Sequence, residues 1–400
     1  MTQTTLRVNE HGLVQHADLQ HLITALHDKG YQVIGPTLQD SAVVYDEIDS
    51  IADLPAGWTD EQDGGTYRLK RRDDAALFGY TNSPQSWKKF LHPPRRRLWQ
   101  AQREDAESDF VFMPENGTLP RYAFLGVRAC ELNAIAIQNT VFTKGPFIDP
   151  MFKALHDAAF IVAVNCIQAG GTCFCASMDS GPHVHSGFDL ALTELIDADR
   201  HVFLVEVGSR RGAEIMEQVP FEPAQEHDLA AARRIESAVA DDMGRTMDTT
   251  DIKQFLYDNV NHPRWDDVAN RCLTCSNCTI VCPTCFCTTV EDVTDLTGNQ
   301  AERWQRWDSC FTLDFAYIHG GSVRALARDR YRQWMTHKLA SWIDQFDSSG
   351  CVGCGRCITW CPVGIDLTEE VRLIRASEQK SDRKKDAADG HHQEHPHPAD

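Results

Sequence analysis

Two short runs of cysteines constrain this chain of 400 residues more than any other feature. The first run is Cys272-Leu-Thr-Cys275-Ser-Asn-Cys278-Thr-Ile-Val-Cys282-Pro283, and the second is Cys351-Val-Gly-Cys354-Gly-Arg-Cys357-Ile-Thr-Trp-Cys361-Pro362. Both have the spacing C-x2-C-x2-C-x3-C-P. Two-residue gaps bend the backbone so that three thiolates face one centre, whereas the fourth cysteine continues into a helix and points elsewhere. We therefore expect each run to serve two different metal centres.

The spacing is that of the ligands in bacterial proteins with two iron–sulfur clusters. It predicts one [4Fe–4S] cluster on Cys272, Cys275, Cys278 and Cys361, and a second on Cys351, Cys354, Cys357 and Cys282. The alternative is zinc, which paired C-x2-C motifs also bind. A zinc site takes four ligands in two pairs and would leave the third and fourth cysteines of each run unexplained. Two clusters are therefore the favoured interpretation.

Seven of the 15 cysteines lie outside these positions and form two groups. The first group comprises Cys130, Cys166, Cys173 and Cys175. These four would suffice for a third iron–sulfur cluster or a thiol site, and the alternative is that they are buried as small apolar residues. The second group comprises Cys285, Cys287 and Cys310. They are auxiliary thiols that either pack around the clusters or bind sulfur species as a redox pair.

The remaining composition limits the class of protein. A formal net charge of −19 argues against nucleic acid or anionic membrane as a partner. No stretch approaches the about 18 apolar residues of a membrane-spanning helix, and the first residues show no basic flank followed by an apolar run. A chain with clustered thiols and no export signal is expected in the reducing cytoplasm.

The pattern along the chain predicts an α+β protein. Residues 1–250 contain short β-branched and aromatic runs between helical stretches, which indicates a mixed α/β domain. Residues 251–376 are mostly helical around the cysteine runs, and we expect an α-helical ferredoxin domain with two [4Fe–4S] clusters. Residues 377–400 contain almost no apolar side chains and are expected to form a disordered, His-rich tail.

The chain has no dinucleotide or triphosphate motif. A redox protein without such a site is usually a conduit that receives electrons from another subunit. We therefore assign no catalytic residue and place catalysis in partner subunits. The basic residues around His92, namely Lys88, Lys89, Arg95, Arg96 and Arg97, are expected to form a solvated face. The alternative is that they dock an acidic partner or an anion such as sulfite.

Several segments resemble one group of proteins. They are YTNSPQSWKKFLHPPRRRLW (80–99), FLGVRACELNAI (124–135), GGTCFCASMDSGP (170–182), SGFDLALTE (186–194) and CVGCGRCITWCPVGID (351–366). These segments resemble the β subunits of cytosolic [NiFe] sulfhydrogenases and the related A subunit of anaerobic sulfite reductase, and the likeness runs through nearly all of residues 75–375. One departure is Ala129, which stands before Cys130 where proline would be expected.

The resemblance implies [4Fe–4S] clusters in a C-terminal α-helical ferredoxin domain. It also implies a flavoprotein partner that binds FAD and NAD(P), together with a hydrogenase or sulfite reductase subunit. We therefore expect an iron–sulfur electron-transfer subunit of a soluble multi-subunit oxidoreductase, of the NAD(P)-linked [NiFe] hydrogenase kind. Two alternatives stay open, a subunit that itself reduces sulfite or polysulfide and a zinc-binding structural module. Arg356 is expected to raise the potential of a nearby cluster through its charge.

Overall fold

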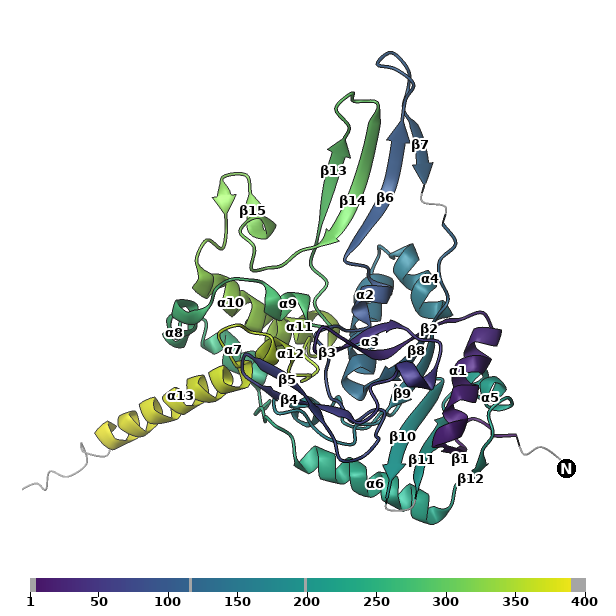
Figure 1. Ribbon diagram of the computed structural model, residues 1–400. Helices are drawn as coiled ribbons and strands as arrows, with labels where there is room; N and C mark the ends of the chain where they lie inside the picture. Colours follow the sequence, from purple (N-terminus) through teal and green to yellow (C-terminus); the bar gives the residue numbers. More distant parts are fainter. Residues whose placement is uncertain (1–4, 115–116, 198–199, 390–400) are drawn as a thin grey trace, which may run out of the picture.

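A large mixed sheet and a helical unit containing both cysteine runs make up most of the molecule (Figure 1). The structure is a computed structural model that describes residues 5–114, 117–197 and 200–389. The strands dominate the N-terminal part and the helices the C-terminal part, so the fold is α+β. This arrangement confirms the fold class predicted from the sequence.

The large sheet has eight strands in the order β12-β1-β11-β10-β9-β8-β2-β3. Its strands are β1 (His11–Gln15), β2 (Gln32–Gln39), β3 (Ala42–Glu47), β8 (Tyr122–Val127), β9 (Phe160–Val164), β10 (Leu190–Ile196), β11 (His201–Val207) and β12 (Glu222–Pro223). The central strands β10, β9, β8 and β2 run parallel, and the outer strands join antiparallel. The carboxyl ends of the parallel strands therefore meet at one edge, where open α/β sheets bind ligands.

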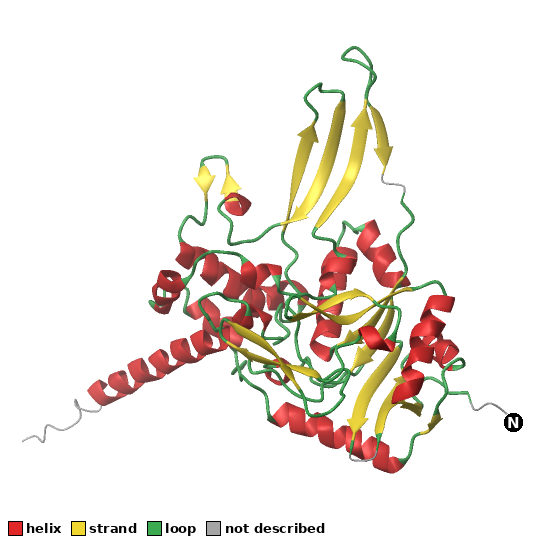
Figure 2. Ribbon diagram, viewed as in Figure 1, coloured by secondary structure: helices red, strands yellow, loops and turns green. Residues whose placement is uncertain are grey.

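Helices cover both faces of this sheet (Figure 2). On one face lie α1 (Leu19–Asp28) and α5 (Arg210–Met216), whose apolar side chains share a core with the strands. On the other face lie α3 (Ala129–Thr143), α4 (Pro150–Ala158) and α6 (Glu226–Asp241). Helix α4 begins at Pro150 because the Asp149 carboxylate accepts hydrogen bonds from the Met151 and Phe152 amides.

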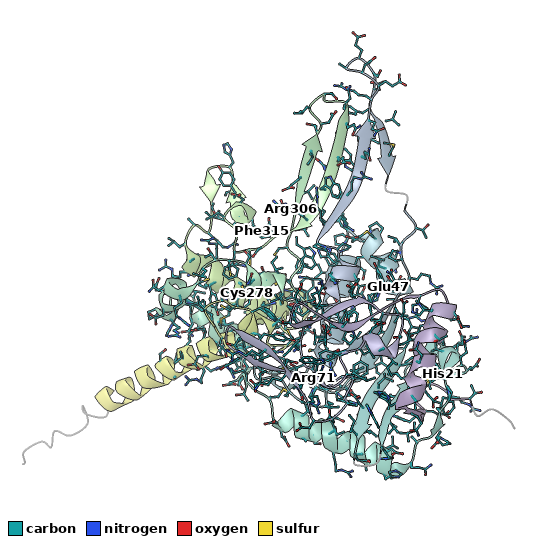
Figure 3. The ribbon with its side chains drawn as sticks, in the orientation of Figure 1. His21, Glu47, Arg71, Cys278, Arg306 and Phe315 are labelled. Atoms are coloured by element: carbon teal, nitrogen blue, oxygen red, sulfur yellow. The ribbon has the colours of Figure 1, made fainter. Side chains whose placement is uncertain are left out.

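The C-terminal unit is mostly helical. Its helices are α7 (Ile252–Asp258), α8 (Arg264–Arg271), α9 (Asn277–Ile280), α10 (Ala327–Thr336), a π-helical turn His337–Ser341, α11 (Trp342–Phe346), α12 (Arg356–Thr359) and α13 (Leu367–Asp389). Trp265, Tyr331 and Trp334 are buried at its centre and pack close to the cysteine runs. Figure 3 shows Cys278 within this unit.

A four-stranded antiparallel sheet projects from the body, in the order β13-β14-β6-β7 (Figure 1). It pairs β6 (Arg95–Gln102) and β7 (Val111–Pro114) with β13 (Thr288–Thr294) and β14 (Gln300–Trp307). The mostly helical character expected of residues 251–376 therefore does not extend to β13 and β14. Many of their side chains are partly or fully exposed, so the apolar alternation that reveals a half-buried strand is weak.

Three small elements complete the described part of the chain. The hairpin of β4 (Trp58–Asp63) and β5 (Thr66–Arg71) packs beside α12. The short hairpin of β15 (Tyr317–Ile318) and β16 (Gly321–Ser322) lies between β14 and α10 in the chain. Helix α2 (Lys88–Leu91) precedes β6.

Helix α13 continues to Asp389 and so includes residues 377–389, the first part of the predicted tail. This segment contains three Lys, two Ala, one Arg and one Glu, which favour helix, and it extends a helix that is already nucleated. The rest of the predicted tail, with its histidines, lies outside the described residues. The boundary predicted at residue 250 stays a prediction.

None of the described helices combines the length and the apolar character that crossing a lipid bilayer requires.

Candidate iron–sulfur sites

The first cysteine run and the end of the second line one cavity of about 450 Å³. Its cysteines include the four predicted to hold the first cluster, Cys272, Cys275, Cys278 and Cys361. Aromatic side chains of Phe311, Tyr331 and Trp334 form its inner wall. Cys275 is exposed at the mouth, so the cavity reaches the molecular surface.

A second cavity, of about 280 Å³, lies deeper in the molecule. It is lined by the four cysteines predicted for the second cluster, Cys282, Cys351, Cys354 and Cys357. Cys357 lines the first cavity as well, so the two cavities are neighbours. In each cavity three cysteines of one run meet the fourth cysteine of the other run, as the spacing predicts.

The two runs have the same local backbone. The residues on either side of the second cysteine are left-handed in both, namely Thr274 (φ 51°) and Ser276 (φ 69°) in the first run, and Gly353 (φ 61°) and Gly355 (φ 74°) in the second. This conformation wraps the chain around the cavity, and the short helices α9 and α12 then carry the fourth cysteine away. Glycine adopts it most readily, and the first run does so with threonine and serine.

Backbone and side-chain donors point at the sulfur atoms. The Thr274 amide lies 3.4 Å from Cys272 Sγ, and the Ile365 amide lies 3.3 Å from Cys361 Sγ. Hydrogen bonds of this kind stabilise sulfur ligands in their charged form and tune the potential of a bound cluster.

A buried lysine faces Cys282. Lys338 Nζ lies 3.1 Å from Cys282 Sγ and also donates to the Thr284 hydroxyl and the Gly350 carbonyl. A hydrogen bond from the Cys285 thiol, together with the Lys338 ammonium, lowers the pKa of Cys282 well below its ordinary value. The lowered pKa favours the thiolate form of Cys282, which is the form that binds metals, whereas the same contact raises the pKa of Cys285.

Lys88 is buried and not solvated, contrary to the expectation for the basic residues around His92. Its Nζ donates to the carbonyl oxygens of Ile280, Cys282 and Cys285. The neighbouring arginines are also engaged, since Arg96 binds Asp149 and Arg97 binds Glu302. Lys88 is inside the molecule because its side chain satisfies backbone oxygens beside the second cavity.

The first group of additional cysteines lines a third cavity, of about 300 Å³. All four of its members, Cys130, Cys166, Cys173 and Cys175, are in this lining. The structure thus brings together residues from α3, the end of β9 and the loop that follows it.

The second group of additional cysteines does not lie in one place. Cys285 hydrogen-bonds Cys282, beside the second cavity. Cys287 and Cys310 contact each other at the base of the projecting sheet, just before β13 and after β14. The Cys310 thiol lowers the pKa of Cys287 to about 7. None of these three residues lines the cavities described above.

Arg356 is not the free positive charge that the sequence suggested. It is fully buried, and its Nη2 donates to Glu131 Oε1 at 2.6 Å. The Glu131 carboxylate offsets part of the Arg356 charge. The Arg356 side chain also hydrogen-bonds Cys354, so Arg356 and Lys338 are both cations in contact with a sulfur of the second cavity.

The arrangement of the sulfur atoms suits clusters better than single ions. A tetrahedral zinc ion holds sulfur at about 2.3 Å and therefore needs its ligands to converge on one point. Within the described residues, no three Cys, His, Asp or Glu side chains converge in this way. The cysteines instead surround cavities, which is what a ligand set for a multi-atom iron–sulfur core requires.

Comparison with known proteins agrees with this geometry. Residues 271–365 match the family model of the 4Fe-4S dicluster domain. Over most of its length the chain is similar to the sulfhydrogenase 2 subunit beta of Pyrococcus furiosus, with 29% identity over 347 residues, covering 86% of this chain and 92% of that subunit. No solved structure matches the chain at a significant level. The two matches support the resemblance to sulfhydrogenase β subunits.

Proposed function

We propose that this chain is the iron–sulfur electron-transfer subunit of a cytoplasmic multi-subunit oxidoreductase. Eight cysteines would hold two [4Fe–4S] clusters, with Cys272, Cys275, Cys278 and Cys361 around the first cavity and Cys282, Cys351, Cys354 and Cys357 around the second. The observation that carries the proposal is the exchange of the fourth cysteine between the runs. When bound, such clusters supply reversible one-electron transfer.

The residues around the two cavities exclude water and stabilise the cysteine thiolates. Tyr331 and Trp334 exclude water from the inner wall of the first cavity. Lys338 stabilises the thiolate of Cys282. The Thr284 hydroxyl accepts a hydrogen bond from the same lysine and also contacts Cys282 Sγ. Burial and hydrogen bonding of this kind are how a protein sets the potential of its clusters.

The mouth of the first cavity is the proposed contact with a partner. The exposed apolar side chains of Leu273 and Val363 lie at the cavity that Cys275 opens to the surface. Apolar side chains around a redox centre favour the close approach of another subunit. Since the related protein is a sulfhydrogenase subunit, we propose hydrogenase-type partners.

The chain lacks a dinucleotide-binding motif, so we propose that a flavoprotein subunit supplies the FAD and NAD(P) chemistry. The complex would then be an NAD(P)-linked [NiFe] hydrogenase, with a sulfite reductase of the anaerobic type as the alternative. In both cases this chain conducts electrons and the partner subunits perform the catalysis.

The ligand assignment is tested on the full chain, purified and reconstituted without oxygen. The double variant Cys351→Ala/Cys354→Ala should lose about four irons and four sulfides, because only two ligands of the second cluster remain. The matched control Cys287→Ala/Cys310→Ala should keep the full content. A colourless protein that contains zinc would contradict the proposal.

The role is tested with partners present. Reduction by NAD(P)H or by hydrogen should be seen in the EPR spectrum of this chain only when the flavoprotein or hydrogenase subunit is added. The conduit role is wrong if the isolated chain consumes sulfite or polysulfide with an artificial electron donor.

A further inference from the structure

We propose that the third cavity is a site for a further [4Fe–4S] cluster, held by Cys130, Cys166, Cys173 and Cys175. The inference deepens the proposed function, since it extends the electron route from the dicluster domain into the α/β region. No other side chain with a thiol, imidazole or carboxylate lines this cavity in the described structure. The lining therefore offers four thiols, which is the ligand set that [4Fe–4S] clusters use, and the Met243 thioether packs beside Cys175.

The topology of the sheet explains why these cysteines meet. Cys130 lies in the first turn of α3, directly after β8, and Cys166 lies just after β9. Strands β8 and β9 are parallel neighbours, so both cysteines lie at the same edge of the sheet. The loop that follows β9 then returns Cys173 and Cys175 to this edge. Four cysteines from three segments of the chain therefore meet in one cavity. Cysteines that served only as small buried apolar residues would not need to meet in this way.

Glycines leave room for two of the sulfur atoms. A Cβ on Gly170 would lie 3.2 Å from Cys173 Sγ, and a Cβ on Gly181 would lie 3.1 Å from Cys175 Sγ. Such contacts are tighter than van der Waals packing allows without movement, so side chains at these positions would displace the thiols from the cavity.

Polar groups at the cavity suit an anionic occupant. Asn82 Nδ2 lies 3.4 Å from Cys173 Sγ. Arg128 lines the cavity, is 1% exposed and binds the backbone carbonyls of Phe78, Tyr80 and Asn165. Its Nε has no hydrogen-bond partner in the described structure. The described residues that line the third cavity include no carboxylate that would pair with Arg128. Its buried guanidinium would therefore offset part of the negative charge of four thiolates.

The third cavity adjoins the second. Phe174 lines the second cavity, whereas its neighbours Cys173 and Cys175 line the third. Asn82 Nδ2, close to Cys173, also donates to the Cys354 carbonyl at 2.6 Å. The three cavities therefore form a row, with Cys357 between the first and second and Phe174 between the second and third.

The far end of this row approaches a second surface. Cys166 is only partly buried and also lines a shallow hollow with His183 and Glu236. The first cavity opens at Cys275 on the helical unit. Three clusters would therefore connect two different surfaces of the molecule, as a subunit between two redox partners requires.

The experiment compares three double variants of the full chain after anaerobic reconstitution. The unaltered chain should contain about twelve irons and twelve sulfides, and Cys173→Ala/Cys175→Ala should contain about eight, a loss of one third. Cys351→Ala/Cys354→Ala should show a loss of the same size, whereas Cys287→Ala/Cys310→Ala should show none. EPR of the reduced Cys173→Ala/Cys175→Ala variant should retain the signals of the other two clusters.

The outcomes separate this inference from the proposed function. About eight irons in the unaltered chain, with no loss in Cys173→Ala/Cys175→Ala, would overturn the third cluster and leave the other two. No loss in Cys351→Ala/Cys354→Ala would overturn the dicluster assignment itself. If Cys173→Ala/Cys175→Ala does not fold, Cys166→Ala replaces it, because Cys166 is at the partly exposed end. Retention of all iron by that variant would overturn the assignment of Cys166, and with it the four-cysteine site.

Discussion

At the scale of single residues, Lys338 connects the helical unit with the second cavity. It lies in a π-helical turn between α10 and α11, an irregularity that is frequent at functional sites. Its Nζ is surrounded by Cys282 Sγ, the Thr284 hydroxyl and the Gly350 carbonyl. A buried ammonium with these partners favours the more negative, reduced form of an adjacent cluster.

Replacing Lys338 tests this effect. Lys338→Met keeps most of the length of the side chain and removes the charge, so the midpoint potential of the second cluster should fall by on the order of 100 mV. For one electron this corresponds to about 2.3 kcal/mol, the energy expected for charges about 7 Å apart at an effective dielectric constant of about 20. The measurement is an EPR-monitored redox titration.

The matched control for this titration is Lys89→Met. Lys89 binds the Tyr45 carbonyl and Gln85 and contacts no cysteine. Its replacement should leave the potential unchanged. Equal potentials in the Lys338→Met variant and the unaltered chain would contradict the role of the lysine.

At the scale of elements, two loops pack backbone against backbone between the second and third cavities. The Phe174 amide donates to the Gly353 carbonyl at 2.8 Å. A Cβ on Gly353 would lie 2.6 Å from the Phe174 carbonyl oxygen, and one on Gly355 would lie 2.4 Å from the Thr172 carbonyl oxygen. The left-handed glycines of the second run therefore serve two purposes, the turn around a cluster and the contact with the other loop.

Alanine at Gly353 should separate these two loops. The left-handed backbone alone costs a side chain about 1–2 kcal/mol, and the overlap with Phe174 adds to that cost. Gly353→Ala should therefore lower the free energy of unfolding by clearly more than Gly187→Ala. Gly187 is the control because it also has a positive φ, of 85°, but its Cβ would meet no atom within 4 Å. Anaerobic guanidinium unfolding measures both, and equal effects would contradict the proposed contact.

The projecting sheet shows where element prediction from sequence is weakest. The run of arginines and Trp99 in β6 resembles a charged surface patch, and it becomes a strand because β14 pairs with it from about 200 residues away. By contrast, the buried strands β8, β9 and β11 carry a strong local signal in their apolar side chains, and they belong to the short β-branched and aromatic runs that indicated a mixed α/β domain.

At the scale of the whole molecule, a buried carboxylate joins the α/β region to the dicluster domain. Glu131 accepts hydrogen bonds from Tyr45, Trp87 and Arg356. Tyr45 belongs to β3 and Arg356 to α12, so a single side chain holds together the sheet and the second cysteine run. Both Glu131 and Arg356 are about 1% exposed.

Removing one charge of this pair should destabilise the whole molecule. Glu131→Gln leaves Arg356 buried without a counter-charge, which costs about 3–5 kcal/mol. The midpoint of anaerobic guanidinium unfolding, followed by tryptophan fluorescence, should fall accordingly. Adding Arg356→Met should recover part of the loss, since both charges are then absent.

An exposed ion pair provides the control for this double-mutant cycle. Arg303 and Asp292 pair on the surface of the projecting sheet, and Asp292→Asn should leave the midpoint unchanged because water solvates both partners. A Glu131→Gln variant as stable as this control would show that the buried pair does not hold the two regions together.

The sequence by itself determined the most about the cysteine runs. Their spacing is local, so it was enough to predict which cysteines surround each of two cavities, and it also indicated the α+β class. The additional group of four cysteines could be named from the sequence, but their role stayed open. Only the tertiary structure decided that Lys338 and Lys88 are buried, that Arg356 pairs with Glu131, and that the third cavity adjoins the second. The physical reason is distance along the chain: contacts such as Asn82 with Cys354, 272 residues apart, depend on how separate segments pack, and no local pattern encodes them.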